Sequence, residues 1–153
     1  MMMEEAQVTR TPKHLWIVGI VSLLWNSVGA TDYVMTRQRN LDWFRSMMPD
    51  TDPNAILAYI DSFPLWAQAG WGFGVWGAFV GSILLLMRSR WAVLSFGLSL
   101  AGAVISLGYQ LMRGPPPGVP NEGAMALMPY FIIAIAAALF YYAWRQRANG
   151  VLR

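Results

Sequence analysis

The stretch LWAQAGWGFGVWGAFVGSILLLM (65–87) decides the fold, because it is apolar along its whole length and contains no charged residue. It is followed by Arg88-Ser89-Arg90 and then by a second uncharged stretch, WAVLSFGLSLAGAVISLGYQLM (91–112). A helix needs about 20 apolar residues to cross the hydrocarbon core of a bilayer, which is about 30 Å thick. Each stretch can therefore span a membrane, and the short connection makes the two helices antiparallel neighbours.

Two further uncharged stretches flank this pair, one between His14 and Asp32 and one between Glu122 and Arg145. The chain of 153 residues is 56% hydrophobic and only 12% charged, whereas a soluble domain has about 25% charged residues. We therefore predict an all-α membrane protein, a four-transmembrane-helix bundle that forms one domain over residues 1–153. The predicted spans are 15–36, 64–87, 91–112 and 124–145.

The distribution of basic residues predicts the orientation. With four spans, both termini lie on the same side of the membrane. That side carries seven basic residues: Arg10, Lys13, Arg88, Arg90, Arg145, Arg147 and Arg153. The opposite side carries four: Arg37, Arg39, Arg45 and Arg113. Because cytoplasmic loops carry the excess of Lys and Arg, both termini are expected in the cytoplasm.

The chain lacks the residues that several classes of chemistry need. The chain has no cysteine and a single histidine, His14, which excludes thiol–disulfide chemistry, thiolate metal sites and haem held by paired histidines. It contains no nucleic-acid motif, and its basic balance is typical of positive cytoplasmic loops. We therefore expect no cofactor, no metal site, no nucleic-acid partner and no enzymatic activity. An enzyme would have to act through Asp32 with Tyr or Arg partners.

The loops on the outer side have recognisable features. In the first outer loop we expect a short interfacial turn and then a second helix, with Thr51 or Asp52 as its cap and Pro53 at its first position. The last outer loop is proline-rich, and Asn121 is the expected cap of the fourth span. The expected turn is formed by Leu41, Trp43, Phe44, Met47 and Met48, and the second helix carries Ile56, Leu57 and Ile60 on one face.

Small residues follow one face of the second span and one face of the third. Residues spaced by four, seven and eleven positions share a helical face, and glycines there let another backbone come close. The two stripes are Gly70, Gly74, Gly77 and Gly81, and Ser95, Ser99, Gly102 and Ser106. They predict close helix packing, either of these two spans with each other or with another subunit.

Polar side chains gather toward the outer ends of the spans. The expected outer-side polar cluster is Asn26, Asp32, Tyr33, Gln68, Tyr109, Gln110, Arg113 and Tyr130. Polar residues inside a membrane usually face the bundle and find partners there. Arg113 lies at the depth of Asp32 and is its expected partner. The cluster is either an ion pair and hydrogen-bond network that fixes the helices or a small polar pocket open to the outer side.

The residues HLWIVGIVSLLWNSVGATDYVMTR (14–37), FPLWA (63–67), GVWGAFVGSILLLMRSRWAV (74–93) and Tyr109-Gln110 resemble those of short bacterial four-span membrane proteins. Members of this group are often labelled "sugar transporter" or hypothetical membrane protein. The resemblance covers nearly the whole chain, and the block from Trp25 to Tyr33 is its most specific part. It implies a four-span fold and a bacterial inner membrane, and it assigns no catalytic or transport residue.

Two functions remain open. In the first, the protein is an accessory or structural subunit that packs against itself or against a larger membrane complex. In the second, it transports or binds a small polar solute, such as a sugar, as an oligomer through the outer-side polar cluster. Proton-coupled four-helix exporters need a carboxylate in mid-membrane, and Asp32 lies too near the end of its span for that role.

Overall fold

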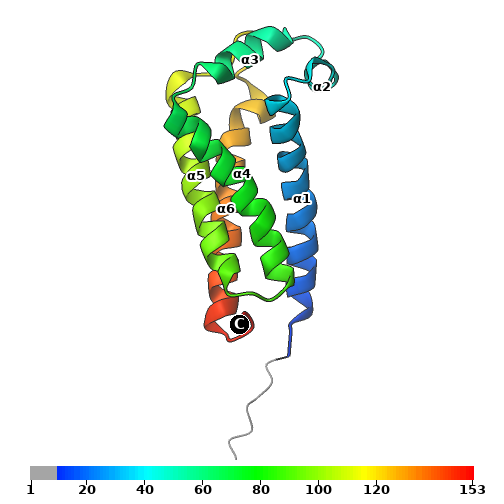
Figure 1. The fold of residues 1–153 in the computed structure, drawn as a ribbon, viewed down its shortest axis with the longest axis vertical. Helices are drawn as coiled ribbons and strands as arrows, with labels where there is room; N and C mark the ends of the chain where they lie inside the picture. Colours follow the sequence, from blue (N-terminus) through cyan, green and yellow to red (C-terminus); the bar gives the residue numbers. More distant parts are fainter. Residues whose placement is uncertain (1–9) are drawn as a thin grey trace, which may run out of the picture.

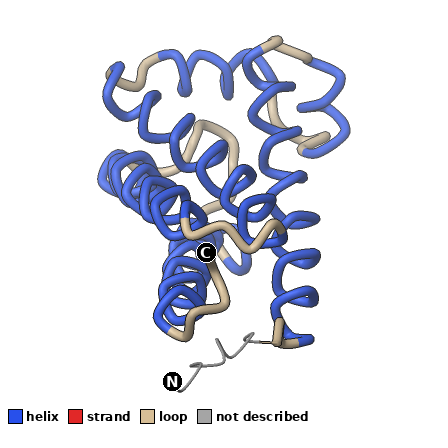
Figure 2. Tube along the Cα trace, turned by 60° about the horizontal axis from the view of Figure 1, so that its bottom comes forward, coloured by secondary structure: helices blue, strands red, loops and turns tan. Residues whose placement is uncertain are grey.

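The computed structural model describes residues 10–153, and helices make up most of this part of the chain (Figure 2). Four long helices run along the long axis of the molecule, and two short ones lie across one end (Figure 1). The bounds are α1 Lys13–Arg37, α2 Leu41–Met47, α3 Pro53–Asp61, α4 Leu65–Leu86, α5 Trp91–Arg113 and α6 Gly123–Ala148. The described residues form no strand.

The four long helices α1, α4, α5 and α6 are long and apolar enough to cross a membrane. Their ends lie within three residues of the predicted spans, which confirms the prediction of an all-helical fold with four helices long enough to span a membrane. Many of their large apolar side chains are exposed, among them Leu24 at 65% and Val28 at 61%. Such surfaces are typical of a multi-pass membrane protein, whose helices are solvated by lipid.

The long helices pack in the order α1, α4, α5, α6, with the closest packing between α4 and α5. The turn between these two contains Arg88, which adopts a left-handed backbone conformation with φ of 58°. Outside this series, α1 touches α6 through two ring contacts. The Trp25 and Phe131 rings meet edge to face at 5.9 Å, and His14 Nδ1 lies 2.6 Å from the Tyr142 hydroxyl.

The main core lies at the end of the bundle opposite α2 and α3. It is built from side chains of α1, α4, α5 and α6 together with the chain's last residues, and its buried members are Leu15, Leu85, Ala92, Val93, Phe96, Leu139, Ala143, Val151 and Leu152. Leu15 and Leu85 are fully buried. After α6 the chain turns back and inserts Val151 and Leu152 beneath the α4–α5 turn.

The helices α2 and α3 form a cap over the other end, as Figure 1 shows. Asp52 is the N-cap of α3, its side chain accepts from the Asn54 N–H, and Pro53 follows at the first helical position, as the sequence predicts. Phe44 of α2 packs on Ile56 and Leu57 of α3 in a separate small core. The expected cap of the last span is wrong by one residue: Glu122 and not Asn121 precedes α6, without a side-chain capping bond.

Candidate functional site

The small-residue stripe of α4 lies against α5 within the same chain. A Cβ placed on Gly77 would lie 2.9 Å from the backbone oxygen of Ser95, and one placed on Gly74 would lie 3.2 Å from the backbone nitrogen of Ala103. A side chain at Gly77 would require the backbone to shift, and one at Gly74 would be packed more tightly than in an ordinary contact. The other glycines of the two stripes also have close neighbours across this interface: Gly70 faces Ile105, Gly81 faces Phe96, and Gly102 faces Gly74.

Serines of α5 use the same close approach to make hydrogen bonds. Ser95 Oγ donates to the Gly77 carbonyl at 2.7 Å, and Ser99 Oγ donates to the Gly74 carbonyl at 2.6 Å. Ser106, the last member of the stripe, is buried in the half of α5 nearer to α2 and α3. The sequence predicts that the stripes pack either against each other or against another subunit, and the structure shows α4 packed on α5. The hydroxyls of Ser95 and Ser99 are hydrogen-bonded within the chain.

Asn26 lies deepest of the eight residues of the expected outer-side polar cluster. Its side chain is 8% exposed, and Nδ2 donates to the Ala78 carbonyl at 3.2 Å and to Ser82 Oγ at 2.9 Å. Ser82 Oγ in turn donates to the Ala78 carbonyl at 2.9 Å. Asn26 therefore joins α1 to α4 and has no contact with the polar residues at the helix ends.

The expectation that Asp32 pairs with Arg113 is wrong. Asp32 Oδ1 accepts a hydrogen bond from the indole Nε1 of Trp43 in α2, at 3.0 Å. The Arg113 guanidinium lies over the rings of Tyr59 and Phe63 at 5.2 and 5.9 Å. Both residues do lie at the same end of the bundle, but each is occupied by an aromatic partner from the cap or the segment that follows it.

Tyr33 and Gln68 meet around Arg37, between the ends of α1 and α4. The Arg37 guanidinium lies 5.5 Å from the centre of the Tyr33 ring, and its Nη1 donates to Gln68 Oε1 at 3.1 Å. Gln68 Nε2 donates to the Phe63 carbonyl at 3.0 Å. The Tyr33 ring also packs edge to face on Trp71, 4.6 Å away. This group clamps α1 to the start of α4.

The phenol of Tyr59 ties the cap to the end of α5. Its hydroxyl donates to the Gly114 carbonyl, and its ring packs on Phe63 at 5.1 Å. Burial raises the pKa of Tyr59, and the nearby positive charge of Arg113 offsets part of that rise. At the other side of the cap, Arg39 and Asp61 form an ion pair at 2.7 Å between the start of α2 and the end of α3.

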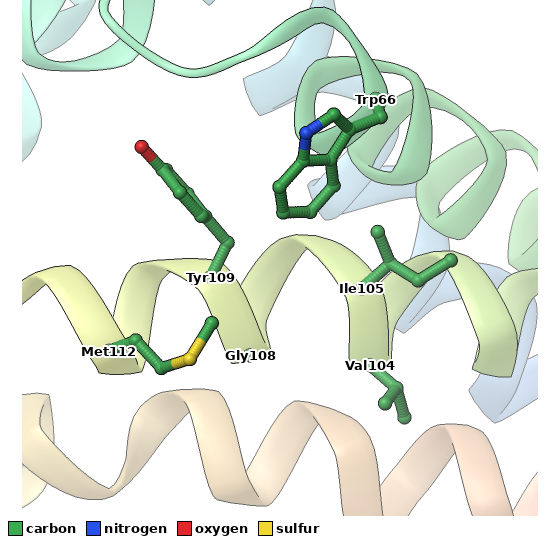
Figure 3. Close-up of a pocket in the computed structure, with 6 residues that line it drawn as sticks. All are labelled: Trp66, Val104, Ile105, Gly108, Tyr109 and Met112. Atoms are coloured by element: carbon green, nitrogen blue, oxygen red, sulfur yellow. The ribbon is translucent and has the colours of Figure 1, made fainter.

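Tyr109 lines an open apolar hollow on the α4–α5 surface, shown in Figure 3. Its ring packs edge to face on Phe63 at 4.9 Å and on Trp66 at 5.2 Å. The hollow has a volume of about 600 Å³ and almost entirely apolar walls. A Cβ on Gly108 would have no neighbour within 4 Å, so the missing side chain of this glycine helps to open the hollow.

Gln110 and Tyr130 are the two cluster residues that share a cavity. It has a volume of about 530 Å³ and lies between the end of α5, the proline-rich loop and the first turns of α6. Asn121 is a third polar residue in its wall, and the rest of the wall is mainly apolar and proline-rich. The eight expected residues thus divide among separate contacts and do not enclose one polar pocket.

Sequence reasoning missed Trp43, Tyr59, Arg37 and Trp71, which supply the partners of the outer-end polar groups. No regular spacing marks Trp43 or Tyr59, because both act from the short cap helices. Arg37 does have a local signal, since it follows Tyr33 by four residues and therefore lies on the same face of α1. Within residues 10–153 no group of three or more His, Cys, Asp or Glu could hold a metal ion.

Comparison with protein-family models, with curated proteins and with solved structures finds no match to the chain. Arguments about its function therefore rest on its own residues and their contacts.

Proposed function

We propose that the chain is a small integral protein of a bacterial inner membrane, with both termini in the cytoplasm, that packs against itself or a larger membrane complex and catalyses no reaction. The cap helices α2 and α3 would lie at the outer membrane surface. The observation that carries this proposal is how little of α6 is buried against the rest of the chain. Only 11% of its most apolar segment is buried within the chain, against 39% for α5.

The outward face of α6 carries the type of motif that brings membrane helices together. Ala134 and Ala138 are both exposed, lie four residues apart and therefore share a helical face. Tyr141 extends this face, with an exposed fraction of 58%. Small residues spaced by four favour close association of helices in lipid, and the comparable stripe of α4 is already occupied by α5.

The polar groups inside the helices also support a structural role. Asn26, Ser95 and Ser99 each hydrogen-bond to a neighbouring helix of the same chain. A transport path through the middle of the bundle would need polar groups free to bind a solute or a proton. Here these groups serve helix packing instead.

Cysteine cross-linking tests the proposal directly, because the chain has no cysteine of its own. The variant Ala138→Cys, in native membranes, is expected to form a covalent dimer or an adduct with another membrane protein. Val28→Cys on α1, which is also exposed, is the matched control and is expected to remain monomeric. Equal monomer yields from both variants, together with unchanged migration of Ala138→Leu in mild detergent, would contradict the proposal.

Labelling with a membrane-impermeant maleimide tests the orientation. Asp50→Cys in the loop between α2 and α3 should react in intact cells. Ser89→Cys in the α4–α5 turn should react only after the membrane is opened. The reverse pattern would place both termini on the outer side.

A second candidate function is the binding of a small polar solute in the 530 Å³ cavity between α5 and α6. Among the described residues, no hydrogen bond occupies the side chains of Gln110, Asn121 and Tyr130, so all three are available to a ligand. Thermal stabilisation by one member of a panel of sugars and polyols, lost in Gln110→Ala and Tyr130→Phe, would support this function. No response to any member of the panel would count against it.

A further inference from the structure

The end of the bundle that carries both termini is rich in positive charge. All seven Lys and Arg residues predicted for this side lie at this end. Among residues 10–153, every Asp and Glu lies at the opposite end or in its loops: Asp32, Asp42, Asp50, Asp52, Asp61 and Glu122. No carboxylate side chain of the described chain therefore neutralises these seven cations.

Backbone hydrogen bonds bring three of these arginines together. The Arg153 N–H donates to the Arg88 carbonyl at 2.8 Å, and the Arg90 N–H donates to the backbone oxygen of Arg153 at 2.9 Å. The residues before Arg153, Val151 and Leu152, are each 4% exposed and belong to the core. The arginines are thus fixed to a rigid base, which lowers the entropy cost of binding a ligand between them.

Arg88 adds an N–H group that the described chain leaves without an acceptor. Its Nε donates to the Val151 carbonyl at 3.4 Å, whereas its Nη2 is enclosed and has no hydrogen-bond partner among the described residues. An enclosed donor of a cationic group that lacks an acceptor is costly, and an anion bound nearby reduces that cost through its charge. Arg90 and Arg153 are exposed, so they are the groups that such an anion can reach.

The surroundings indicate which anion this is. The Arg90 guanidinium lies 5.7 Å from the ring of Trp91, which is 58% exposed. Exposed tryptophans at the ends of spans lie at the level of the lipid headgroups. A guanidinium at that level is positioned for a lipid phosphate, which it binds through two parallel N–H donors.

We propose that Arg90 and Arg153, held together beside the half-buried Arg88, bind the phosphate of an anionic phospholipid. The ligand is a phosphodiester lipid with a net negative charge, such as phosphatidylglycerol. Each basic side chain near a charged membrane surface contributes enough to change binding about fivefold. Loss of both arginines should therefore weaken binding roughly 25-fold.

Native mass spectrometry of the full chain in detergent tests this proposal, with phosphatidylglycerol and phosphatidylcholine as the two probes. We expect the wild-type protein to retain phosphatidylglycerol in preference to phosphatidylcholine. The variant with Arg90→Gln and Arg153→Gln should lose that preference. The matched control is Arg145→Gln with Arg147→Gln, which removes the same charge from the same end and should keep the preference.

Each other outcome overturns the proposal. Equal losses in the two double variants would mean that net charge, and not a site, attracts the lipid. Displacement of the lipid by inorganic phosphate at similar concentration would mean that the site takes free phosphate. If the Arg90/Arg153 variant does not fold, Arg90→Gln alone replaces it, because the Arg90 backbone N–H that holds Arg153 remains. An unchanged preference in that folded variant would also contradict the proposal.

Discussion

Asn26 Nδ2 lies 2.9 Å from Ser82 Oγ, and this contact joins α1 to α4 at a point where both side chains are buried. The same Asn26 nitrogen reaches the Ala78 carbonyl, so one amide group satisfies two acceptors of the neighbouring helix. In lipid, where no water competes, such bonds help to fix which helix packs on which.

Replacement of Asn26 by alanine should loosen α1 from α4. We expect a loss of about 1–2 kcal/mol in the free energy of unfolding, because buried hydrogen bonds between helices are lost. Ser27→Ala is the control, since the Ser27 hydroxyl bonds only to the Leu23 carbonyl of its own helix. Unfolding in a denaturing detergent mixture measures both. Equal stability of the two variants would show that the Asn26 contact adds nothing.

Replacement of Gly77 by leucine should force α4 and α5 apart. The new side chain would meet the backbone of Ser95 and Ser99, and overpacking of this kind typically costs about 1–3 kcal/mol. Gly108→Ala is the matched control on α5, because a Cβ there has no neighbour within 4 Å. Its helix propensity should make the protein up to about 1 kcal/mol more stable. A stable Gly77→Leu protein would argue against the observed packing.

Replacement of Trp43 by phenylalanine should release the cap from α1 while the spans remain folded. The substitution keeps an apolar ring but removes the donor to Asp32. We expect faster hydrogen–deuterium exchange in residues 41–61 and unchanged exchange in α4 and α5. Asp42→Asn serves as the control, since the Asp42–Arg45 pair is solvent-exposed and exposed pairs contribute little. Similar exchange in both variants would rule out this role for Trp43.

The ionisation of Tyr59 should weaken the cap at high pH. Burial raises the pKa of Tyr59 in the folded protein, so the folded state holds this proton more tightly than the unfolded state does. The resulting contribution to stability is complete below the unfolded value of about 10 and is lost as the pH rises through the folded value. The thermal unfolding temperature of the wild type should therefore fall more steeply with increasing alkaline pH than the unfolding temperature of Tyr59→Phe. Parallel curves would contradict this assignment.

The sequence is sufficient to predict the four long helices, the tight connection at Arg88-Ser89-Arg90 and a cap of α3 at Thr51 or Asp52, since each depends on neighbours in the chain. It does not predict the partners of Asp32 and Arg113. Hydropathy fixes how deep a residue lies, and these two do share a depth. It does not fix how the short cap helices fold back, and Trp43 and Tyr59 reach the two charged groups from there.

Asn26 illustrates the same limit inside the bundle. Its position in an apolar stretch predicts a polar contact, but its partner Ser82 is 56 residues further along the chain. Only the choice of α4 as the neighbour of α1 brings the two together. That choice depends on side-chain shape around each helix, which a one-dimensional pattern of apolar residues does not contain.

The packing order of the helices has a consequence for how the protein is made. α4 and α5 are consecutive, closely packed and joined by a short turn, so they can enter the membrane as a preformed hairpin. α1 is synthesised first but meets its partner only after the cap and α4 have left the ribosome. α6 arrives last, after its docking surface on α5 already exists. Assembly would thus proceed outward from the hairpin, with the first-made and last-made helices added to its two sides.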